Sequence, residues 1–133
     1  MPGGPVIAHG VDLVEVPRIA AVIERHESRF LDRTFTHAEL AYADANPKRR
    51  TEHLAARFAA KEAVFKALGT GWARGIAWTD CEVTRSGEGR PGVALTGKAA
   101  KIAEALGVVG WLLSLSHTES VAMASVIGFG DNH

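Results

Sequence analysis

The sequence predicts a single α+β domain in which a mainly antiparallel sheet packs on one long central helix. Segments with strand-like and helix-like patterns follow one another in the order β-α-α-α-β-β-α-β-β. Neighbouring strand segments in the second half are joined by short turns, which favours antiparallel pairing over a doubly wound sheet. The 133 residues fit one domain spanning 1–133, because a chain of this size buries roughly two-thirds of its unfolded surface without disulfides or structural metals.

The first strand and the first helix are expected near the start of the sequence. Residues 5–14 are rich in β-branched side chains and are interrupted by Gly10, a pattern that predicts a strand. Pro17 suits the first turn of a helix. Residues 18–29 then carry apolar side chains at a helical period, so we expect a helix there.

Two further helices are expected before Gly69. Thr36 and Glu39 form a capping-box pattern that opens a short helix through residue 43, and Asn46-Pro47 ends it. Residues 51–68 form the strongest helical segment, because alanine and long side chains dominate it and Gly69 supplies a stop. This segment is apolar on two opposite faces, which is typical of a central helix. One face carries Leu54, Phe58, Phe65 and Leu68, and the other carries Ala56, Ala60, Ala63 and Ala67.

The second half of the chain is expected to supply four strands and one helix. Runs of β-branched and aromatic residues separated by glycine-containing turns predict the strands, and Thr96 is a candidate helix cap. The expected elements are strands at 76–85 and 93–95, a helix between Thr96 and Gly107, and strands at 108–117 and 121–127.

Composition and charge narrow the class of protein. Fifteen Lys and Arg residues balance fifteen Asp and Glu residues, which argues against a protein whose main partner is nucleic acid or an anionic membrane. Cys81 is the single cysteine, which excludes an intramolecular disulfide and a multi-cysteine metal site and suits a reducing cytosol. No apolar run approaches the ~20 residues of a membrane span, and the first residues lack the pattern of a signal peptide. We therefore expect a soluble, cytoplasmic protein.

Two carboxylates and one lysine are the strongest candidates for chemistry. Asp12 lies in an apolar strand segment, where an ionised carboxylate is costly unless it is paired or binds a cation; the alternative is that it faces solvent and caps a turn. Glu62 and Lys66 are one helical turn apart on the expected central helix, where charges need partners; the alternative is a routine surface ion pair. Magnesium takes one or two carboxylates together with substrate phosphate oxygens, so Asp12 and Glu62 are a candidate magnesium site.

Two glycine-containing turns and one strand end are further candidates. Gly69-Thr-Gly71 follows the central helix, and Gly89-Arg-Pro-Gly92 opens a strand. Either segment could present N–H groups or a guanidinium to a phosphate, or be a turn and nothing more. Ser114-Leu-Ser-His117 ends another strand. Its serines and histidine do not indicate a serine hydrolase, because the nucleophile elbow of such enzymes is missing. A histidine at the end of a strand is more often structural than catalytic, and both interpretations apply to His117.

Together these segments resemble the holo-[acyl-carrier-protein] synthases, the short bacterial 4'-phosphopantetheinyl transferases. The resemblance covers residues 6–127, nearly the whole chain. It rests on Gly10-Val-Asp-Leu13 with Glu15 and Arg18, on the helix motif at 57–71, on Gly89-Arg-Pro91 and on Ser114-Leu-Ser-His117, in that order. The helix motif, Arg57-Phe-Ala-Ala-Lys-Glu-Ala-Val-Phe-Lys-Ala-Leu-Gly-Thr-Gly71, is the most specific of these.

The resemblance implies transfer of 4'-phosphopantetheine from coenzyme A to a serine of apo-acyl carrier protein, in support of fatty acid biosynthesis, with adenosine 3',5'-bisphosphate as by-product. It implies that Asp12 and Glu62 hold Mg²⁺ against the coenzyme A diphosphate, and that Lys66 neutralises charge on the leaving phosphate. A carboxylate or a metal-bound water would accept the serine proton. The residues implied to line the nucleotide groove are Arg57, Gly69, Arg90, Pro91, Ser116 and His117, with Lys48, Arg49 and Arg50 near the 3'-phosphate.

The resemblance also implies a homotrimer with sites at subunit boundaries. Carrier proteins are acidic, so Arg18, Arg25 and Arg29 on the first helix would meet the partner; the alternative is an ordinary solvated helix face. Two rival functions belong to other classes. The first is a non-catalytic module that binds coenzyme A or its carrier protein, and it is disfavoured because both metal carboxylates are present. The second is a magnesium-dependent pyrophosphohydrolase. It is disfavoured because that class carries several clustered glutamates on a helix, whereas Glu62 stands alone here.

Overall fold

The computed structural model describes residues 4–71 and 75–132, and it confirms the predicted fold class and order of elements. The helices are α1 (Val16–Thr34), α2 (His37–Asp44), α3 (Arg50–Ala67) and α4 (Gly97–Leu106), with two 3₁₀ turns, η1 (Pro47–Arg49) and η2 (Trp78–Asp80). The strands are β1 (Val6–Glu15), β2 (Cys81–Arg85), β3 (Pro91–Leu95), β4 (Gly110–His117) and β5 (Val121–Phe129). Within the described ranges no helix combines the length and the apolar character that a membrane crossing requires.

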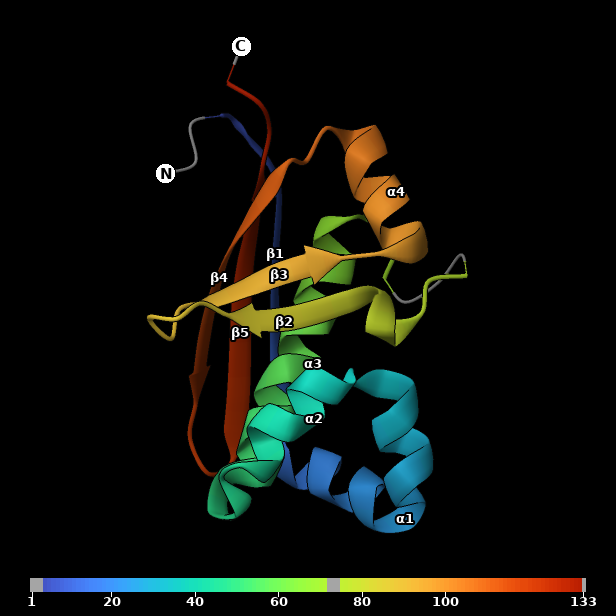
Figure 1. Ribbon diagram of the computed structural model, residues 1–133, viewed down its shortest axis with the longest axis vertical. Coiled ribbons are helices and arrows are strands. Elements are labelled where there is room, and N and C mark those ends of the chain that lie inside the picture. Colours follow the sequence, from blue (N-terminus) through green and yellow to red (C-terminus); the bar gives the residue numbers. More distant parts are fainter. Residues whose placement is uncertain (1–3, 72–74, 133) are drawn as a thin grey trace.

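The strands of the described residues pair antiparallel in two sheets. β5 lies between β1 and β4 in a three-stranded sheet, and β2 and β3 form a separate hairpin. Helix α3 packs along β1 and β5 on one face of the larger sheet, while β2, α1 and α2 contact it from other sides. Figure 1 shows α1 and α2 at one end of the sheet and α4 at the other, near the two chain ends. The predicted central helix is therefore confirmed.

Small residues let β1 approach α3 closely. The side chains of Ala59, Ala60 and Ala63 on α3 are completely buried. A Cβ added at Gly10 on β1 would lie 2.1 Å from the carbonyl oxygen of Ala63, far inside van der Waals contact. Gly10 is thus required because the backbone of α3 occupies the space that a side chain would fill.

We expect Gly10→Ala to destabilise the protein by about 2–3 kcal/mol, because the strand must move away from the helix backbone to admit the methyl group. Urea unfolding monitored by circular dichroism measures the change. Gly87→Ala is the matched control: a Cβ at Gly87 meets nothing within 4 Å, so the change in its free energy of unfolding should stay within about 0.5 kcal/mol. Equal stability of the two variants would contradict the close approach of β1 and α3.

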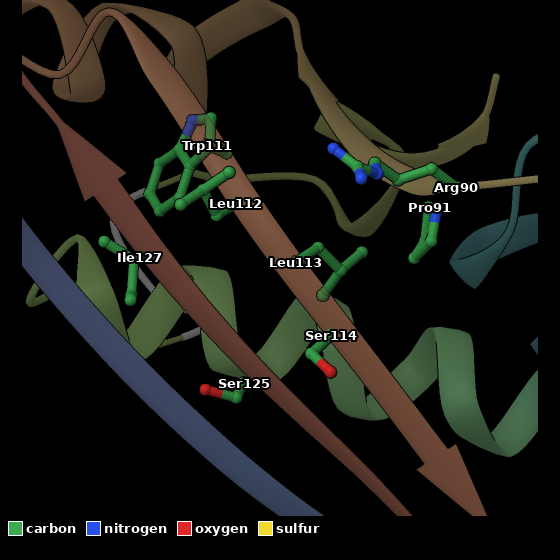
Figure 2. A pocket seen from close by; sticks show the side chains of 8 residues that line it. All are labelled: Arg90, Pro91, Trp111, Leu112, Leu113, Ser114, Ser125 and Ile127. Atoms are coloured by element: carbon green, nitrogen blue, oxygen red, sulfur yellow. The ribbon is translucent and has the colours of Figure 1, made fainter. Parts of the chain in front are cut away.

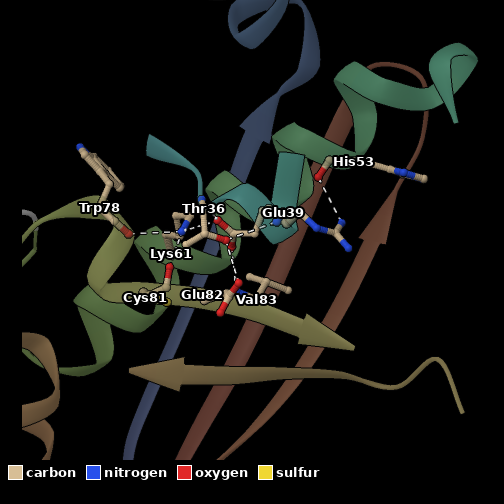
Figure 3. Close-up of polar contacts among 9 residues, drawn as sticks. Thr36, Glu39, His53, Lys61, Trp78, Cys81, Glu82 and Val83 are labelled. Carbon is tan, nitrogen blue, oxygen red and sulfur yellow. Dashed lines mark hydrogen bonds and ion pairs between the residues drawn. The ribbon is translucent and has the colours of Figure 1, made fainter. Parts of the chain in front are cut away.

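The strand expected at 76–85 is shorter than predicted. It begins only at Cys81, and the preceding residues form η2. The ammonium group of Lys61 on α3 accounts for the difference, because it donates hydrogen bonds to the carbonyls of both Trp78 and Cys81 (Figure 3). The ring of Trp78 also stacks on Phe58 at 4.9 Å between centroids. These non-local contacts bend the chain, and the residue pattern of a strand does not reveal them.

Helix α1 extends beyond the predicted end at residue 29. It continues to Thr34 past a kink at His26, whose φ of −133° is not helical. The extension places Leu31 and Phe35 in a small second core with Ala43 and Leu54, where all four are buried. Burial of these side chains, rather than local propensity, sets the end of the helix.

Candidate active site

Asp12 lies on the face of β1 that is turned toward α3. From Ala8 to Glu15 the strand alternates between buried and exposed residues, and Asp12 falls on the buried side with 9% exposure. Lys66 Nζ on α3 donates to Asp12 Oδ1 at 2.7 Å and to the carbonyl of Val11 at 3.2 Å. Asp12 is therefore a buried, ion-paired carboxylate and not a solvated turn residue.

The charges of Asp12, Glu62 and Lys66 act on one another. The pKa of Glu62 is raised, first by burial and then by the negative charge of Asp12, although the positive charges of Lys66 and Arg18 oppose that rise. The pKa of Lys66 is also raised, chiefly by its hydrogen bond to Asp12. The ammonium group of Lys66 thus faces the carboxyl groups of Asp12 and Glu62, so these three side chains together carry an excess of negative charge.

A divalent cation fits this arrangement of carboxylates. The second oxygen of Asp12, Oδ2, is buried and has no hydrogen-bond partner in the part of the chain that the structure describes. A buried acceptor without a partner is costly, and a cation would satisfy it and relieve the repulsion from Glu62. No group of three or more His, Cys, Asp or Glu side chains suited to a metal occurs among the described residues. A cation held here would complete its shell with ligand oxygens and water, as Mg²⁺ does beside phosphates.

A cavity of about 310 Å³ opens beside the two carboxylates. β1 contributes Asp12 to its wall, α3 contributes Glu62, and α1 contributes Arg18, which is exposed at the surface. The other lining residues are all apolar: Leu13, Val14, Ile19, Val22, Phe30 and Phe58. Arg25 and Arg29 are exposed farther along α1. The structure thus brings one of the three predicted partner-binding arginines directly to the carboxylate cavity.

A second cavity, of about 390 Å³, carries a set of basic residues. Lys48 and Arg49 line it from η1, and His117 lines it from the end of β4. Glu52 lies among them on the first turn of α3 and bonds to His117. The structure therefore brings together three of the residues predicted to bind a nucleotide, from segments far apart in the sequence. Glu52 is not among the residues predicted from the sequence, and its only local signal is its position three residues after Arg49.

Other predicted nucleotide-binding residues are placed differently. Arg50 Nε binds Asp44 Oδ1 at 2.7 Å. The Arg57 side chain is buried, with its guanidinium carbon 4.0 Å from the centre of the Tyr42 ring. Gly69 ends α3 with a φ of +79°, a conformation that favours glycine, and Ser116 is exposed on β4. Arg50 and Arg57 thus have protein partners where the prediction assigned them a ligand.

Arg90 and Pro91 line a third cavity, of about 260 Å³, between the β2–β3 hairpin and the larger sheet. Figure 2 shows them across from Leu113 and Ser114 on β4, with Ser125 and Ile127 on the neighbouring strand β5. Asp12 and Glu62 line a different cavity. Within one chain, the predicted nucleotide-binding turn and the predicted metal site therefore open into separate hollows.

Comparisons with known proteins agree on one family. A family model described as the 4'-phosphopantetheinyl transferase superfamily matches residues 8–124. The holo-[acyl-carrier-protein] synthase of Koribacter versatilis is 50% identical over 122 residues, which cover 92% of this chain and 97% of that protein. The enzyme of the same name from Desulforudis audaxviator is 51% identical over 127 residues, which cover 94% of each. The Bacillus anthracis holo-(acyl-carrier-protein) synthase in complex with coenzyme A (3',5'-ADP) is 30% identical, with a TM-score of 0.77 over 95% of this chain and 98% of that one.

The matched range extends from β1 into β5 and includes the two carboxylates and Lys66. The relatives are matched over nearly their full length, so the likeness concerns whole enzymes and not a shared fragment. The chain therefore belongs to the 4'-phosphopantetheinyl transferase superfamily, in the family of the holo-[acyl-carrier-protein] synthases.

Proposed function

We propose that this transferase moves 4'-phosphopantetheine from coenzyme A to a serine of apo-acyl carrier protein in a Mg²⁺-dependent reaction. Adenosine 3',5'-bisphosphate is the second product, and the reaction serves fatty acid biosynthesis in the cytoplasm. The observation that carries the proposal is the grouping of Asp12, Glu62 and Lys66 at one cavity, with the buried Asp12 Oδ2 left without a partner. The coenzyme A bound to the Bacillus anthracis relative supports the choice of donor.

The reaction is a phosphoryl transfer with a simple balance of bonds. The serine oxygen forms a bond to the phosphorus on the pantetheine side of the diphosphate. The bond from that phosphorus to the bridging oxygen breaks, and this oxygen leaves on adenosine 3',5'-bisphosphate while the serine proton passes to a base. Such transfers need positioning and positive charge around the oxygens. When bound by Asp12 and Glu62, Mg²⁺ would supply Lewis-acid stabilisation of the diphosphate.

Lys66 and the cavity lined by Lys48, Arg49 and His117, called the basic cavity below, have separate roles in this proposal. Lys66 Nζ lies 2.7 Å from Asp12 Oδ1 on a side chain that is half exposed, so it can turn to a phosphate oxygen and neutralise the leaving group. Lys48, Arg49 and His117 would hold the 3'-phosphate, because two cations and an imidazole converge on their cavity. Arg50 would lie near the same phosphate, and Arg90 and Pro91, with Gly69 and Ser116, would contact the remainder of the nucleotide.

We further propose that the enzyme is a homotrimer whose sites lie between subunits. The face of the larger sheet opposite α3 exposes large apolar side chains on all three strands, and the exposed fractions are 62% for Leu13, 41% for Met123 and 42% for Leu112. An apolar face of this kind on a sheet usually marks an interface. Leu13 also lines the carboxylate cavity and Leu112 the Arg90 cavity. A second copy on this face would therefore lie beside both hollows.

Met123→Glu is expected to break this assembly. Met123 lies on the middle strand of the exposed face, paired with Leu13 on one side and Ser116 on the other. A charge buried there without a partner would be strongly unfavourable. Multi-angle light scattering should show a trimer for the wild type and for the control Met123→Leu, and a monomer with little transfer activity for Met123→Glu. A wild-type monomer at the assay concentration would contradict the trimer.

The arginines of α1 are proposed to receive the acidic carrier protein. Reversing one charge should act on association, and salt should weaken the effect by screening it. We expect Arg25→Glu to lower kcat/KM for the carrier protein by about tenfold at low salt while the KM for coenzyme A stays unchanged. Lys101→Glu, the same reversal on α4 at the other end of the sheet, is the control. Equal loss in both variants, or a change in the KM for coenzyme A alone, would contradict carrier docking on α1.

The test of the function is the intact mass of the carrier protein after incubation with the enzyme, Mg²⁺ and coenzyme A. Transfer adds one phosphopantetheine to the carrier and releases adenosine 3',5'-bisphosphate. A pyrophosphohydrolase would instead release free 4'-phosphopantetheine together with adenosine 3',5'-bisphosphate and leave the carrier mass unchanged. A binding module would leave both the carrier and coenzyme A unchanged, and either of these results would overturn the proposal.

A further inference from the structure

The basic cavity contains a carboxylate at a place where the proposed function needs to attract an anion. Glu52 has a side chain that is only 14% exposed, and it lies close to two of the three groups that would bind the phosphate, His117 and Arg49. Its Oε1 oxygen is 2.9 Å from His117 Nδ1 and 3.8 Å from Arg49 Nη1. A negative charge opposes anion binding, so a carboxylate at this place needs another role that outweighs the repulsion, such as orienting the cationic groups around it.

The contacts of His117 show what that purpose is. Nδ1 is tied to Glu52, and the ring meets the ring of His53 edge-on, with 5.6 Å between centroids and 76° between planes. Nε2 has no hydrogen bond to any residue in the described ranges, and a quarter of the side chain is exposed. The partner of one imidazole nitrogen fixes how the other is presented. The ring is thus held on one side and open on the other.

We propose that Glu52 is a positioning residue for the phosphate monoester of the donor nucleotide. It orients the His117 ring through the hydrogen bond to Oε1 and attracts the Arg49 guanidinium to the same oxygen by charge, so that His117 Nε2 and the N–H groups of Arg49 meet the same phosphate. When the ring carries protons on both nitrogens, it donates from Nδ1 to Glu52 and from Nε2 to a phosphate oxygen. The inference rests on the proposed function, because it assumes that coenzyme A is the donor.

A simpler role for Glu52 makes a different prediction. As an acidic residue in the first turn of α3, Glu52 also stabilises the positive end of that helix. If stabilising the helix were its whole role, Glu52→Gln would lower stability slightly and would affect all donors alike. If its charge acted only as a repulsive centre for the phosphate, Glu52→Gln would lower the KM for coenzyme A. Positioning predicts that this KM rises, although a repulsive charge has been removed.

The experiment compares coenzyme A with 3'-dephospho-coenzyme A, which lacks only the phosphate monoester, in the wild type, Glu52→Gln, His117→Gln and the double variant. We expect Glu52→Gln to raise the KM for coenzyme A about tenfold, a usual size for loss of an orienting contact, with kcat and the KM for the dephospho donor unchanged. The double variant should be little worse than His117→Gln, because the two residues act as a unit. Glu119→Gln removes another charge from the same cavity and should not raise the KM for coenzyme A.

Several results would overturn the inference. These are an unchanged or lowered KM for coenzyme A in Glu52→Gln, an equal loss with both donors, and additive effects in the double variant. Calorimetric binding of the two donors to each folded variant gives the same comparison without turnover. A wild type that binds coenzyme A more tightly than the dephospho donor but modifies no carrier would defeat the proposed reaction and leave the role of Glu52 intact. Equal wild-type binding of both donors would defeat the role of Glu52 alone.

Discussion

Glu62→Gln and Asp12→Asn are each expected to reduce the rate of transfer by at least about a hundredfold, the equivalent of some 3 kcal/mol of transition-state stabilisation. Each change removes one of the two carboxylates that line the cavity while keeping the size of the side chain. The fold should survive, because the Asp12 oxygen Oδ2 makes no hydrogen bond within the described residues and Glu62 is only half buried. Transfer to carrier protein, followed by mass at several Mg²⁺ concentrations, measures the effect.

Metal concentration separates a ligand role from a structural one. If the carboxylates bind Mg²⁺, raising its concentration should restore part of the activity of both variants, since a weaker site is filled by mass action. Glu104→Gln, an exposed change on α4, is the matched control and should behave as the wild type. Full activity of Glu62→Gln and Asp12→Asn at low Mg²⁺ would show that these carboxylates do not hold the metal.

Lys61→Met is expected to lower the free energy of unfolding by about 3–5 kcal/mol, because it leaves a buried carboxylate without its counter-charge. Lys61 Nζ lies 2.9 Å from Glu39 Oε1, and both side chains are completely buried. Glu39 also accepts hydrogen bonds from the backbone N–H groups of Thr36 and Val83 (Figure 3). One ion pair thus joins α3 to the start of α2 and to β2. Denaturant unfolding measures the change in stability.

A double-mutant cycle identifies the buried pair as the cause. Glu39→Gln alone should also be strongly destabilising, and Lys61→Met with Glu39→Gln should cost less than the sum of the two single changes, because no charge is then left alone. Lys101→Met removes an exposed lysine and should shift stability by no more than about 0.5 kcal/mol. Additive single effects, or a loss below about 1 kcal/mol in Lys61→Met, would contradict the proposed importance of the pair.

Local signals in the sequence were sufficient for the class and order of elements. Pro17 lies in the first turn of α1, the capping box of Thr36 and Glu39 opens α2, and Gly69 follows α3, as predicted. Each of these signals depends on a few adjacent residues. The predicted bounds are wrong where contacts with residues distant in the sequence determine the local structure, as when Lys61 shortens the strand expected at 76–85.

The candidate site divides in the same way. A carboxylate in an apolar strand and charges on a central helix were visible in the sequence, and the structure brings Asp12, Glu62 and Lys66 together. The bond between Glu52 and His117 joins residues 65 positions apart, and no periodicity or spacing predicts it. The predicted role of Arg57 comes from a motif, and its burial against Tyr42 depends on how α2 packs on α3, which the motif does not show.

Binding of Mn²⁺, followed by electron paramagnetic resonance, tests most directly whether the two carboxylates hold a metal at the diphosphate of coenzyme A. Mn²⁺ substitutes for Mg²⁺ because both prefer oxygen ligands. The wild type should bind Mn²⁺ weakly alone and far more tightly once coenzyme A is added, since two carboxylates leave most of the metal shell to the ligand. Asp12→Asn and Glu62→Gln should each lose this gain while Glu104→Gln keeps it. An equal affinity for Mn²⁺ in all four proteins with coenzyme A present would contradict the metal site at Asp12 and Glu62.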